Sequence, residues 1–469
     1  MAKVKTTFFC TECGNETPRW AGQCPACRAW NTLVEESVGP RRSRPARSRP
    51  ARRSEAPAPA RLADVAGGDD TRWLTGLAEF DFVLGGGVVP GSLVLVGGEP
   101  GIGKSTLLLQ VAARLEAAGR PALYVSGEES PAQVRLRADR LGGGAGDVLF
   151  LAETELEAVL ARAAEHDPAV LFVDSIQTVH TTELEGAPGN VSQVRECAAR
   201  LQRYAKEAGV AVFLVGHVTK GGSVAGPKTL EHIVDTVLYF EGGGGLDHRV
   251  LRATKNRFGG VDEIGVFRMT AEGLVAVGNP SELFLGERTR GVSGAAVVAT
   301  IEGTRPLLVE VQALCTKASY GAPQRVTTGF DRQRLALLLA VLEKRAGLAF
   351  GQVDVFLNVV GGVRLVETAG DLAVAAALAS SIFDREVPGD AVFLGELGLG
   401  GELRPVGQVE RRLAEAARMG FRHAYLPRRA VPAAWRAGGA GGDGAAGPPE
   451  GLACVPLAGV AEMLEQLFQ

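Results

Sequence analysis

The order of apolar and polar positions predicts buried strands alternating with helices in the middle of the chain. Apolar runs with the length of buried strands occur at SLVLVGG (92–98), PALYVS (121–126), AVLFVDS (169–175) and VAVFLVGH (210–217). The segment 106–119 has the apolar spacing of a helix, and Ser130 followed by Pro131 is typical of a helix start. A strand–loop–helix unit is therefore expected around residue 100.

After about residue 285 the pattern changes. Strands and turns alternate over 291–315, and a strand pair or a strand and turn is expected over 354–365. Three helices are expected: an amphipathic one at 332–347, an apolar one at 370–384 and a third at 409–420. The longest apolar runs, such as LAVAAALA (372–379), are too short to span a bilayer, so no membrane segment is expected.

Composition narrows the class of protein. A hydrophobic content of 46% and a charged content of 22% are ordinary for a globular chain, and 469 residues suggest two to four domains. The net charge of −3 means that any nucleic-acid surface must be local. The N-terminus lacks the pattern of a secretion signal, so a cytoplasmic location is expected.

Four of the seven cysteines form a cluster with metal-ligand spacing. Cys10, Cys13, Cys24 and Cys27 follow the pattern C-x2-C-x10-C-x2-C, which suits one tetrahedral Zn²⁺ with a closed shell of four thiolates. A closed shell indicates a structural or recognition role. Trp20 and Trp30 flank the second pair, and core packing is expected for at least one of them.

A basic linker follows the cysteine cluster. Seven arginines lie between Arg41 and Arg53, with Pro and Ala in the gaps and no hydrophobic period. This composition predicts an extended, disordered segment. Contact with phosphate and a merely solubilising tether remain open alternatives.

The strongest motif is GGEPGIGKST. Gly98, Gly103, Lys104 and Ser105 fit G-x-x-x-x-G-K-[ST] between the expected strand and helix, so residues Gly98, Glu99, Pro100, Gly101, Ile102, Gly103, Lys104, Ser105 and Thr106 are expected to bind ATP. Backbone N–H groups would surround the phosphates at a helix N-terminus. Lys104 would reach the β- and γ-phosphates, and Ser105 would hold Mg²⁺.

Three polar residues at strand ends supply partners for this motif. Asp174 ends one apolar run and suits the acidic residue that holds Mg²⁺ through water. Glu128 follows another run and could orient the attacking water. His217 ends a further strand and could sense the γ-phosphate. The loop after it contains Lys220, Gly221, Gly222 and Lys228, a composition that suits contact with single-stranded nucleic acid.

The stretch KNRFG completes a pattern that resembles known families. The order of the Gly98–Ser105 motif, Glu128, Asp174, His217 and KNRFG (255–259) is similar to RecA-type ATPases, most closely to DnaB-like replicative helicases. With the cysteine cluster in front, the chain resembles the RadA (Sms) family of bacterial DNA repair proteins over nearly its whole length. The implied fold class is α/β, with a RecA-type P-loop core.

The resemblance implies roles for the KNRFG residues. Lys255 and Arg257 would face the γ-phosphate in the neighbouring subunit's site and stabilise the charge that develops there. Asn256, Phe258 and Gly259 would hold the shape of the turn and transmit the ATP state. The alternative is a solvated basic turn.

The resemblance also implies a function. It predicts an ATP hydrolase that works as a hexameric ring helicase or translocase and promotes branch migration in recombinational DNA repair. The implied partners are single-stranded and branched DNA and the RecA recombinase. A RecA-like strand-exchange filament and an ATP-dependent protease of the Lon type are the alternatives.

The C-terminal region resembles the proteolytic domain of Lon proteases, an α/β fold with a Ser–Lys dyad. The match puts Thr368 at the serine position and Glu410 at the lysine position, so a carboxylate is expected to face a threonine and proteolysis is not expected. A scaffold that binds duplex DNA is expected instead, with candidate cations at Arg305, Lys317, Arg325, Arg332, Arg334, Lys344 and Arg345. The predicted domains are a zinc knuckle (1–36), the linker (37–62), the ATPase core (63–284) and the Lon-like domain (285–469).

Overall fold

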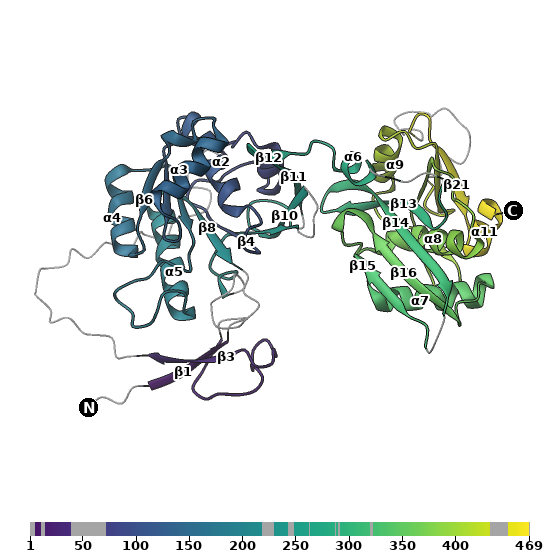
Figure 1. Ribbon diagram of the computed structural model, residues 1–469, viewed down its shortest axis with the longest axis horizontal. Helices are drawn as coiled ribbons and strands as arrows, with labels where there is room; N and C mark the ends of the chain where they lie inside the picture. The colour runs from purple at the N-terminus through teal and green to yellow at the C-terminus, as the bar shows by residue number, and fades with distance from the viewer. Residues whose placement is uncertain are drawn as a thin grey trace, which may run out of the picture. The chain divides into compact units, whose positions relative to one another are not determined.

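The computed structural model describes residues 5–10, 15–38, 72–217, 229–242, 248–261, 263–286, 288, 291–318, 322–431 and 449–468 (Figure 1). The chain divides into two compact units, residues 1–276 and 277–469. The division falls before helix α6 (Pro280–Leu285), earlier than the boundary that the sequence suggests after residue 284. The reason is that α6 packs on the second unit, where the Ser281 hydroxyl donates to Glu415 at 2.6 Å.

The N-terminal knuckle is built on a small antiparallel sheet in the order β2-β1-β3. Its strands are β1 (Lys5–Cys10), β2 (Glu16–Thr17) and β3 (Leu33–Val38). A cluster of Cys10, Cys24 and Leu33 is buried there, with Phe8 packed against it. Trp20 and Trp30 remain 59% and 70% exposed, so the expectation that one of them packs in a core is wrong. The buried cluster is too small to take up an indole ring.

The rest of the first unit is a nine-stranded sheet in the order β12-β11-β10-β9-β4-β8-β7-β5-β6. Strands β6, β5, β7, β8, β4 and β9 pair in parallel, and β10, β11 and β12 continue the sheet in antiparallel pairs. The strand bounds are β4 (Leu93–Gly98), β5 (Ala122–Ser126), β6 (Leu149–Ala152), β7 (Val170–Asp174), β8 (Ala211–His217), β9 (Thr236–Glu241), β10 (His248–Asn256), β11 (Ile264–Thr270) and β12 (Gly273–Ala276).

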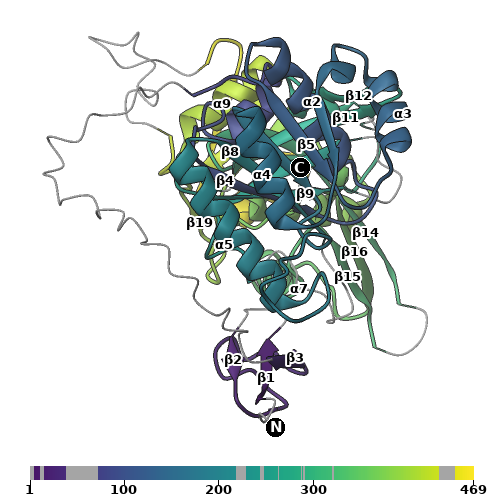
Figure 2. The ribbon, with the colours of Figure 1, turned by 90° about the vertical axis from the view of Figure 1, so that its left-hand side faces the viewer.

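Helices cover both faces of this sheet (Figure 2). Because side chains alternate along a strand, Val94 and Val96 of β4 pack with Leu107 of α2 on one face, while Leu93 and Leu95 pack with α4 and α5 on the other. The helices are α1 (Ala78–Val83), α2 (Lys104–Ala117), α3 (Pro131–Leu141), α4 (Leu156–His166) and α5 (Val191–Ala208), with a short 3₁₀ turn at Ala145–Asp147.

The four predicted strands and the predicted helices of this sheet are confirmed, whereas residues 39–62 of the predicted linker lie outside the described residues. Helix α3 begins as expected, with Pro131 in its first turn and the Ser130 hydroxyl accepting from the Gln133 N–H, while the Gln133 side chain accepts from the Ser130 N–H. Helix α2 begins at Lys104, inside the GGEPGIGKST motif. No helix of the described residues is both long enough and apolar enough to cross a bilayer.

The second unit contains a mixed seven-stranded sheet in the order β15-β16-β14-β13-β17-β20-β21. The strands are β13 (Ala295–Glu302), β14 (Arg305–Lys317), β15 (Arg325–Thr328), β16 (Val353–Val359), β17 (Ala391–Phe393), β20 (His423–Pro427) and β21 (Ala453–Leu457), and β18 (Glu396–Leu397) pairs with β19 (Leu403–Arg404). The helices are α6, α7 (Arg332–Ala346), α8 (Asp371–Phe383), α9 (Val409–Arg418) and α11 (Val460–Phe468), with 3₁₀ turns at Val360–Gly362 and Thr368–Gly370. The three helices predicted for this region are confirmed as α7, α8 and α9.

An ion pair between the buried Arg412 and the partly buried Glu367 joins α9 to the turn before α8. Arg412, only 2% exposed, donates to both carboxylate oxygens of Glu367 at 2.6 and 2.7 Å and to the carbonyl of Ala299 at 2.8 Å. Burial alone would raise the pKa of Glu367, but the hydrogen bonds from Arg412 and Thr300 outweigh it and hold the pKa below its usual value. The pair therefore contributes stability in its ionised form.

We predict that Arg412→Ala destabilises the second unit by about 3 kcal/mol or more, because it leaves the Glu367 charge partly buried without its partner. Since the pKa of Glu367 is lowered in the folded state, this stabilisation is present above its unfolded-state pKa and is lost as the pH falls through the folded value. The measurement is urea unfolding at neutral and acidic pH. Arg411→Ala, an exposed neighbour on the same helix, is the control. Equal stability of the two variants at neutral pH would contradict the prediction.

Candidate functional site

Parallel pairing brings the ends of four strands to one edge of the nine-stranded sheet. Gly98 of β4 pairs with His217 of β8, and Ser126 of β5 pairs with Asp174 of β7. Because the strands run in the same direction, these residues all lie at the carboxyl edge. The fold thus brings the three polar strand ends that the sequence predicts to cooperate, at Glu128, Asp174 and His217, to the same edge as the phosphate loop that begins at Gly98.

The loop from β4 to α2 requires glycine at two positions. Gly98 has a φ of 153°, and a Cβ there would lie 2.6 Å from the carbonyl oxygen of Phe240. Gly103 has a φ of 114°, and a Cβ there would lie 2.7 Å from Cε of Met269. The glycines let the loop lie close to the sheet, and the loop leads into the N-terminus of α2, where free backbone N–H groups can bind a phosphate. All nine residues predicted to bind ATP lie in this loop and the first turn of α2.

Lys104 is the buried cation of this loop. It is 3% exposed, and its Nζ donates to the carbonyl oxygens of Gly98 and Glu99 at 2.9 Å each. Burial lowers the pKa of Lys104, while the nearby charges of Asp174 and Glu128 act in the opposite direction. A buried ammonium held by main-chain carbonyls at a helix N-terminus fits the phosphates of a nucleotide.

Asp174 is held by two hydroxyl groups. Its Oδ2 accepts a hydrogen bond from the Tyr124 hydroxyl at 2.6 Å, and its carboxylate also interacts with the Ser105 hydroxyl. Burial raises the pKa of Asp174, and the two hydroxyl contacts oppose that rise. Ser105 and Asp174, the residues predicted to hold Mg²⁺, therefore lie together, as the hard oxygen donors of this ion require.

Tyr124 is a site residue that sequence reasoning missed. Its ring is fully buried and stacks on Phe172, so it reads as an ordinary core aromatic in the run PALYVS. Its hydroxyl reaches Asp174 only because β5 and β7 are neighbours in the sheet. The only indication in the sequence is a tyrosine near the end of an apolar run, which is weak evidence for a role in the site.

Glu128 lies between Ser175 and His217. Its carboxylate accepts a hydrogen bond from the Ser175 hydroxyl, and Nε2 of His217 lies 3.3 Å from its Oε1, an electrostatic contact without an aligned hydrogen bond. The contact with His217 lowers the pKa of Glu128, burial opposes this, and the Ser175 hydroxyl lowers the pKa further. An ionised carboxylate beside the phosphate loop can orient a water molecule. The predicted Lys220, Gly221, Gly222 and Lys228 lie outside the described residues.

The KNRFG residues lie at the end of β10 and in the turn after it. Nζ of Lys255 donates to the carbonyls of Glu231 and Val234 at 2.6 and 2.8 Å. Burial and the like charge of Arg257 hold the pKa of Lys255 below its usual value. The Arg257 guanidinium donates to Asp235 at 3.0 Å and its side chain is 51% exposed.

The remaining KNRFG residues shape the turn. Oδ1 of Asn256 accepts from the N–H of Phe258 at 2.9 Å, and its Nδ2 donates to the carbonyl of Leu84 at 3.2 Å. A Cβ on Gly259 would lie 2.8 Å from the Cα of Gly85, so glycine is needed at this close approach. The turn is thereby held against the segment that follows α1.

This turn lies at the opposite edge of the sheet from the phosphate loop. The N–H of Arg257 donates to the carbonyl of Asp235, and the N–H of Asp235 donates to the carbonyl of Leu93, the first residue of β4. The phosphate loop starts at the other end of β4, at Gly98, after five steps of about 3.3 Å each, or about 16 Å. Arg257 therefore lies far from the phosphate loop of its own chain.

Three cysteines converge in the knuckle. The sulfur atoms of Cys10, Cys24 and Cys27 lie within 4.8 Å of one another, and those of Cys10 and Cys27 are 3.6 Å apart. Tetrahedral Zn²⁺ with bonds of about 2.3 Å would separate two sulfurs by about 3.8 Å, so the three thiols fit this ion. Cys13, the predicted fourth ligand, lies outside the described residues.

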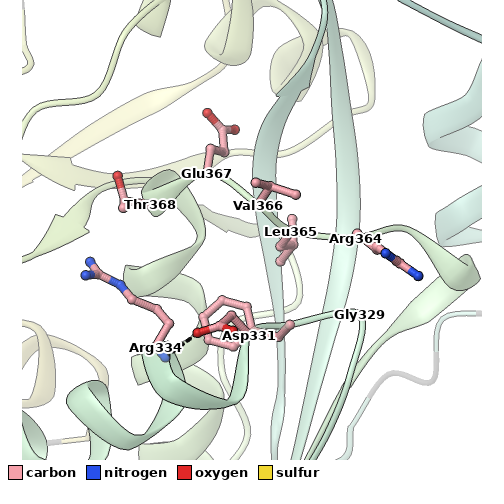
Figure 3. Close-up of a pocket in the computed structure, with 9 residues that line it drawn as sticks. Gly329, Asp331, Arg334, Arg364, Leu365, Val366, Glu367 and Thr368 are labelled. Atoms are coloured by element: carbon pink, nitrogen blue, oxygen red, sulfur yellow. Dashed lines mark hydrogen bonds between the residues drawn. The ribbon is translucent and has the colours of Figure 1, made fainter. Parts of the chain in front are cut away.

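In the second unit, Thr368 meets a carboxylate other than the one expected. Its hydroxyl donates to Oε2 of Glu396 at 2.8 Å, whereas Glu410 is exposed in the first turn of α9. The expectation that Glu410 faces Thr368 is therefore wrong, because α9 turns Arg412 inward and Glu410 outward. Thr368 lines a cavity of about 690 Å³ together with Arg334 and Arg364 (Figure 3). None of the residues lining this described cavity is a lysine.

The seven candidate cations of the second unit differ in exposure and in their partners. Arg325 donates to the carbonyls of Gln324 and Phe350, and Arg334 pairs with the buried Asp371, so both support the fold. Arg305 is half-buried. The exposed members are Lys317, Arg332, Lys344 and Arg345.

Comparison with known families assigns the parts of the chain. An AAA domain model matches residues 70–223, a rubredoxin metal binding domain model matches 8–35, and a model of subunit ChlI of Mg-chelatase matches 324–430. The predicted fold class is confirmed: the chain is α/β, with a P-loop core of the RecA type. A zinc ribbon precedes this core in the sequence, and a ChlI-like domain, related to Lon, follows it. The AAA domain contains the phosphate loop, Glu128, Asp174 and His217.

Full-length relatives settle the family. The chain is 49% identical to the DNA repair protein RadA of Bacillus subtilis over 99% of both chains, and 49% identical to that of Pseudomonas aeruginosa over 100% of both. It is 51% identical to the RadA protein of Brucella abortus over 91% of this chain and 92% of the relative. Because these matches cover nearly the whole of this chain and of each relative, the chain belongs to the RadA family of DNA repair proteins.

Proposed function

We propose that this RadA-family ATPase is a DNA motor that forms a hexameric ring, moves on single-stranded DNA and promotes branch migration of recombination intermediates. Branched DNA and the RecA recombinase are its proposed partners, and the cytoplasm is its proposed location. The AAA domain supplies the ATPase, and the names of the relatives support a role in DNA repair. Hydrolysis that depends on assembly, as a ring motor would need, is supported by how the candidate residues are divided between two edges of the sheet.

The carboxyl edge supplies the groups that bind and hydrolyse ATP. Lys104 would contact the β- and γ-phosphates, and Glu128 would orient the attacking water. Ser105 and Asp174 would hold Mg²⁺, which neutralises phosphate charge when bound. His217, 3.3 Å from Glu128, would respond when the γ-phosphate leaves.

The observation that carries the proposal is the position of Arg257. The turn that contains it lies at the amino edge, about 16 Å along β4 from the phosphate loop, which is farther than an arginine side chain extends. The side chain pairs with Asp235 and is still 51% exposed, so its charge is accessible at this edge. A cation that cannot serve its own site but is available to a neighbour's fits an arginine finger, which makes hydrolysis depend on assembly.

The alternatives make different assemblies or different chemistry. A strand-exchange protein would form an open helical filament on DNA, whereas a ring motor would form a closed ring. Electron microscopy with an ATP analogue and forked DNA therefore separates the two. Proteolysis is not supported, because the Thr368 hydroxyl meets the Glu396 carboxylate and not an amine.

Lys104→Ala should reduce ATP hydrolysis by about 100-fold or more, because it removes the buried cation that contacts the phosphates. The measurement is phosphate release with and without single-stranded DNA. Lys206→Ala, an exposed lysine at the end of α5, is the matched control and should keep full turnover. Near-normal turnover of the Lys104 variant would refute the assignment of the phosphate loop.

Arg257→Ala should keep the affinity for ATP within a few-fold and lose DNA-stimulated turnover by about 100-fold or more, since the cation acts on the neighbouring site. Lys255→Ala should behave in the same way. The decisive measurement mixes two inactive proteins. Lys104→Ala subunits retain the finger, and Arg257→Ala subunits retain the pocket, so mixed assemblies should recover turnover at the interfaces where the two meet.

Co-assembly must be shown independently, for example by capture of one tagged variant with the other. If the variants co-assemble and turnover does not return, Arg257 does not act across an interface. It would then be a contact within its own chain or to DNA.

Protein purified without chelator should contain one Zn²⁺ per chain. Cys24→Ser should release it, because it removes one of the converging thiolates. The ATPase core should stay folded, since its two apolar clusters are formed chiefly by its own strands and helices. Cys315→Ser, remote in sequence from the cluster, is the control and should keep the metal. Elemental analysis without zinc in the unaltered protein would contradict the assignment.

A further inference from the structure

Asp235 joins three strands at the amino edge of the nine-stranded sheet. It directly precedes β9, and its side chain is 5% exposed. Its Oδ2 accepts from the N–H of Leu93, the first residue of β4, at 3.1 Å. Its Oδ1 accepts from Nη1 of Arg257, just after β10, at 3.0 Å.

The main chain of Asp235 bonds to the same two residues. Its N–H donates to the carbonyl of Leu93 at 2.9 Å, and its carbonyl accepts from the N–H of Arg257 at 3.2 Å. Four hydrogen bonds thus fix both the backbone and the side chain of Asp235 between Leu93 and Arg257. Among the described residues, Asp235 is the acceptor of the Arg257 guanidinium.

The turn before Asp235 is fixed as well. Lys255 donates to the carbonyls of Glu231 and Val234, so the turn that leads into β9 is held by one KNRFG cation and ends at the acceptor of the other. The guanidinium of Arg257 has further N–H donors beyond the one bonded to Asp235. With 51% of its side chain exposed, it is anchored on one side and presented to the outside on the other.

We propose that Asp235 is the positioning residue of Arg257: it aims the guanidinium at the neighbouring subunit's nucleotide and ties it to the strand that carries its own subunit's phosphate loop. The inference rests on the proposed role of Arg257 across the interface. It adds a physical link between two neighbouring nucleotide sites. Through Asp235, Arg257, which would serve one site, is attached to Leu93 at the start of β4, and the phosphate loop of the other site begins at Gly98, at the end of the same strand.

The two bonds of the Asp235 side chain make different demands. The N–H of Leu93 needs only an acceptor, and the amide oxygen of an asparagine would serve as well as a carboxylate. The guanidinium of Arg257 gains its strong bond from the negative charge. Asp235→Asn therefore separates a structural role, which it should preserve, from a positioning role, which it should damage.

The first experiment uses full-length Asp235→Asn protein. We expect an unchanged affinity for ATP, a melting temperature within a few degrees of the unaltered protein, and a kcat for DNA-stimulated hydrolysis lower by about 10- to 100-fold with little change in KM, the size of one charge-assisted hydrogen bond. Asp139→Asn, which removes the charge of an exposed aspartate paired with Arg135 on α3, is the matched control and should keep full turnover. Unchanged kcat in Asp235→Asn would overturn the proposal.

The second experiment tests whether Asp235 acts through Arg257. The double variant Asp235→Asn/Arg257→Ala should hydrolyse ATP no more slowly than Arg257→Ala alone, because a positioning residue has no effect once the positioned group is gone. If the losses multiply instead, Asp235 acts by another route and the proposal fails.

The third experiment separates this inference from the function on which it rests. Arg257→Ala subunits, with an intact pocket, are mixed with Lys104→Ala subunits that carry either Asp235 or Asp235→Asn. We expect the mixture whose Lys104→Ala subunits keep Asp235 to recover turnover. The mixture whose Lys104→Ala subunits carry Asp235→Asn should recover a turnover at least about 10-fold lower. Equal recovery would overturn the role of Asp235 while the finger stands. Recovery in neither mixture, with co-assembly shown, would overturn both.

Discussion

The site depends on the parallel pairing of β4, β5, β7 and β8. These strands are far apart in the sequence, and parallel pairing brings all their carboxyl ends to the same edge of the sheet. The charges gathered there would each be costly to bury alone. Lys104 lies buried close to Asp174 and Glu128, so the opposite charges partly compensate one another. The cation of the phosphate loop is therefore one member of a set of partly compensating charges.

The sequence predicts well what is contained in one short stretch. The phosphate loop, the cysteine cluster and the start of α3 each depend on residue types at fixed local spacing, and the structure forms all three in the residues that it describes. Glu128, Asp174 and His217 were expected near the phosphate loop because they follow buried strands, but the individual contacts between side chains on different strands were not predictable. Tyr124 and Asp174 are 50 residues apart, and Asp235 and Arg257 are 22 apart, so their contacts depend on the strand order of the sheet.

The second unit shows how matching a motif by position can select the wrong partner. Glu410 and Arg412 lie on the short helix α9. Residues i and i+2 of a helix project to different sides, so these two side chains cannot face the same partner. Arg412 faces inward to Glu367, and the carboxylate at Thr368 comes instead from β18. The exposed Trp20 and Trp30 have a similar lesson: in a knuckle whose apolar cluster is this small, a large aromatic residue is no evidence of a core.

The two ends of β4 give each chain two unlike edges, one with a phosphate loop and one with Arg257. A contact that joins a loop to an Arg257 of another chain pairs different surfaces and is heterologous, so it repeats head to tail. An open head-to-tail assembly of such subunits would have an unpaired phosphate loop at one end and an unpaired Arg257 at the other. Only a closed ring would leave neither unpaired. The number of subunits in such a ring would be set by the rotation between neighbouring subunits and not by any residue of the site.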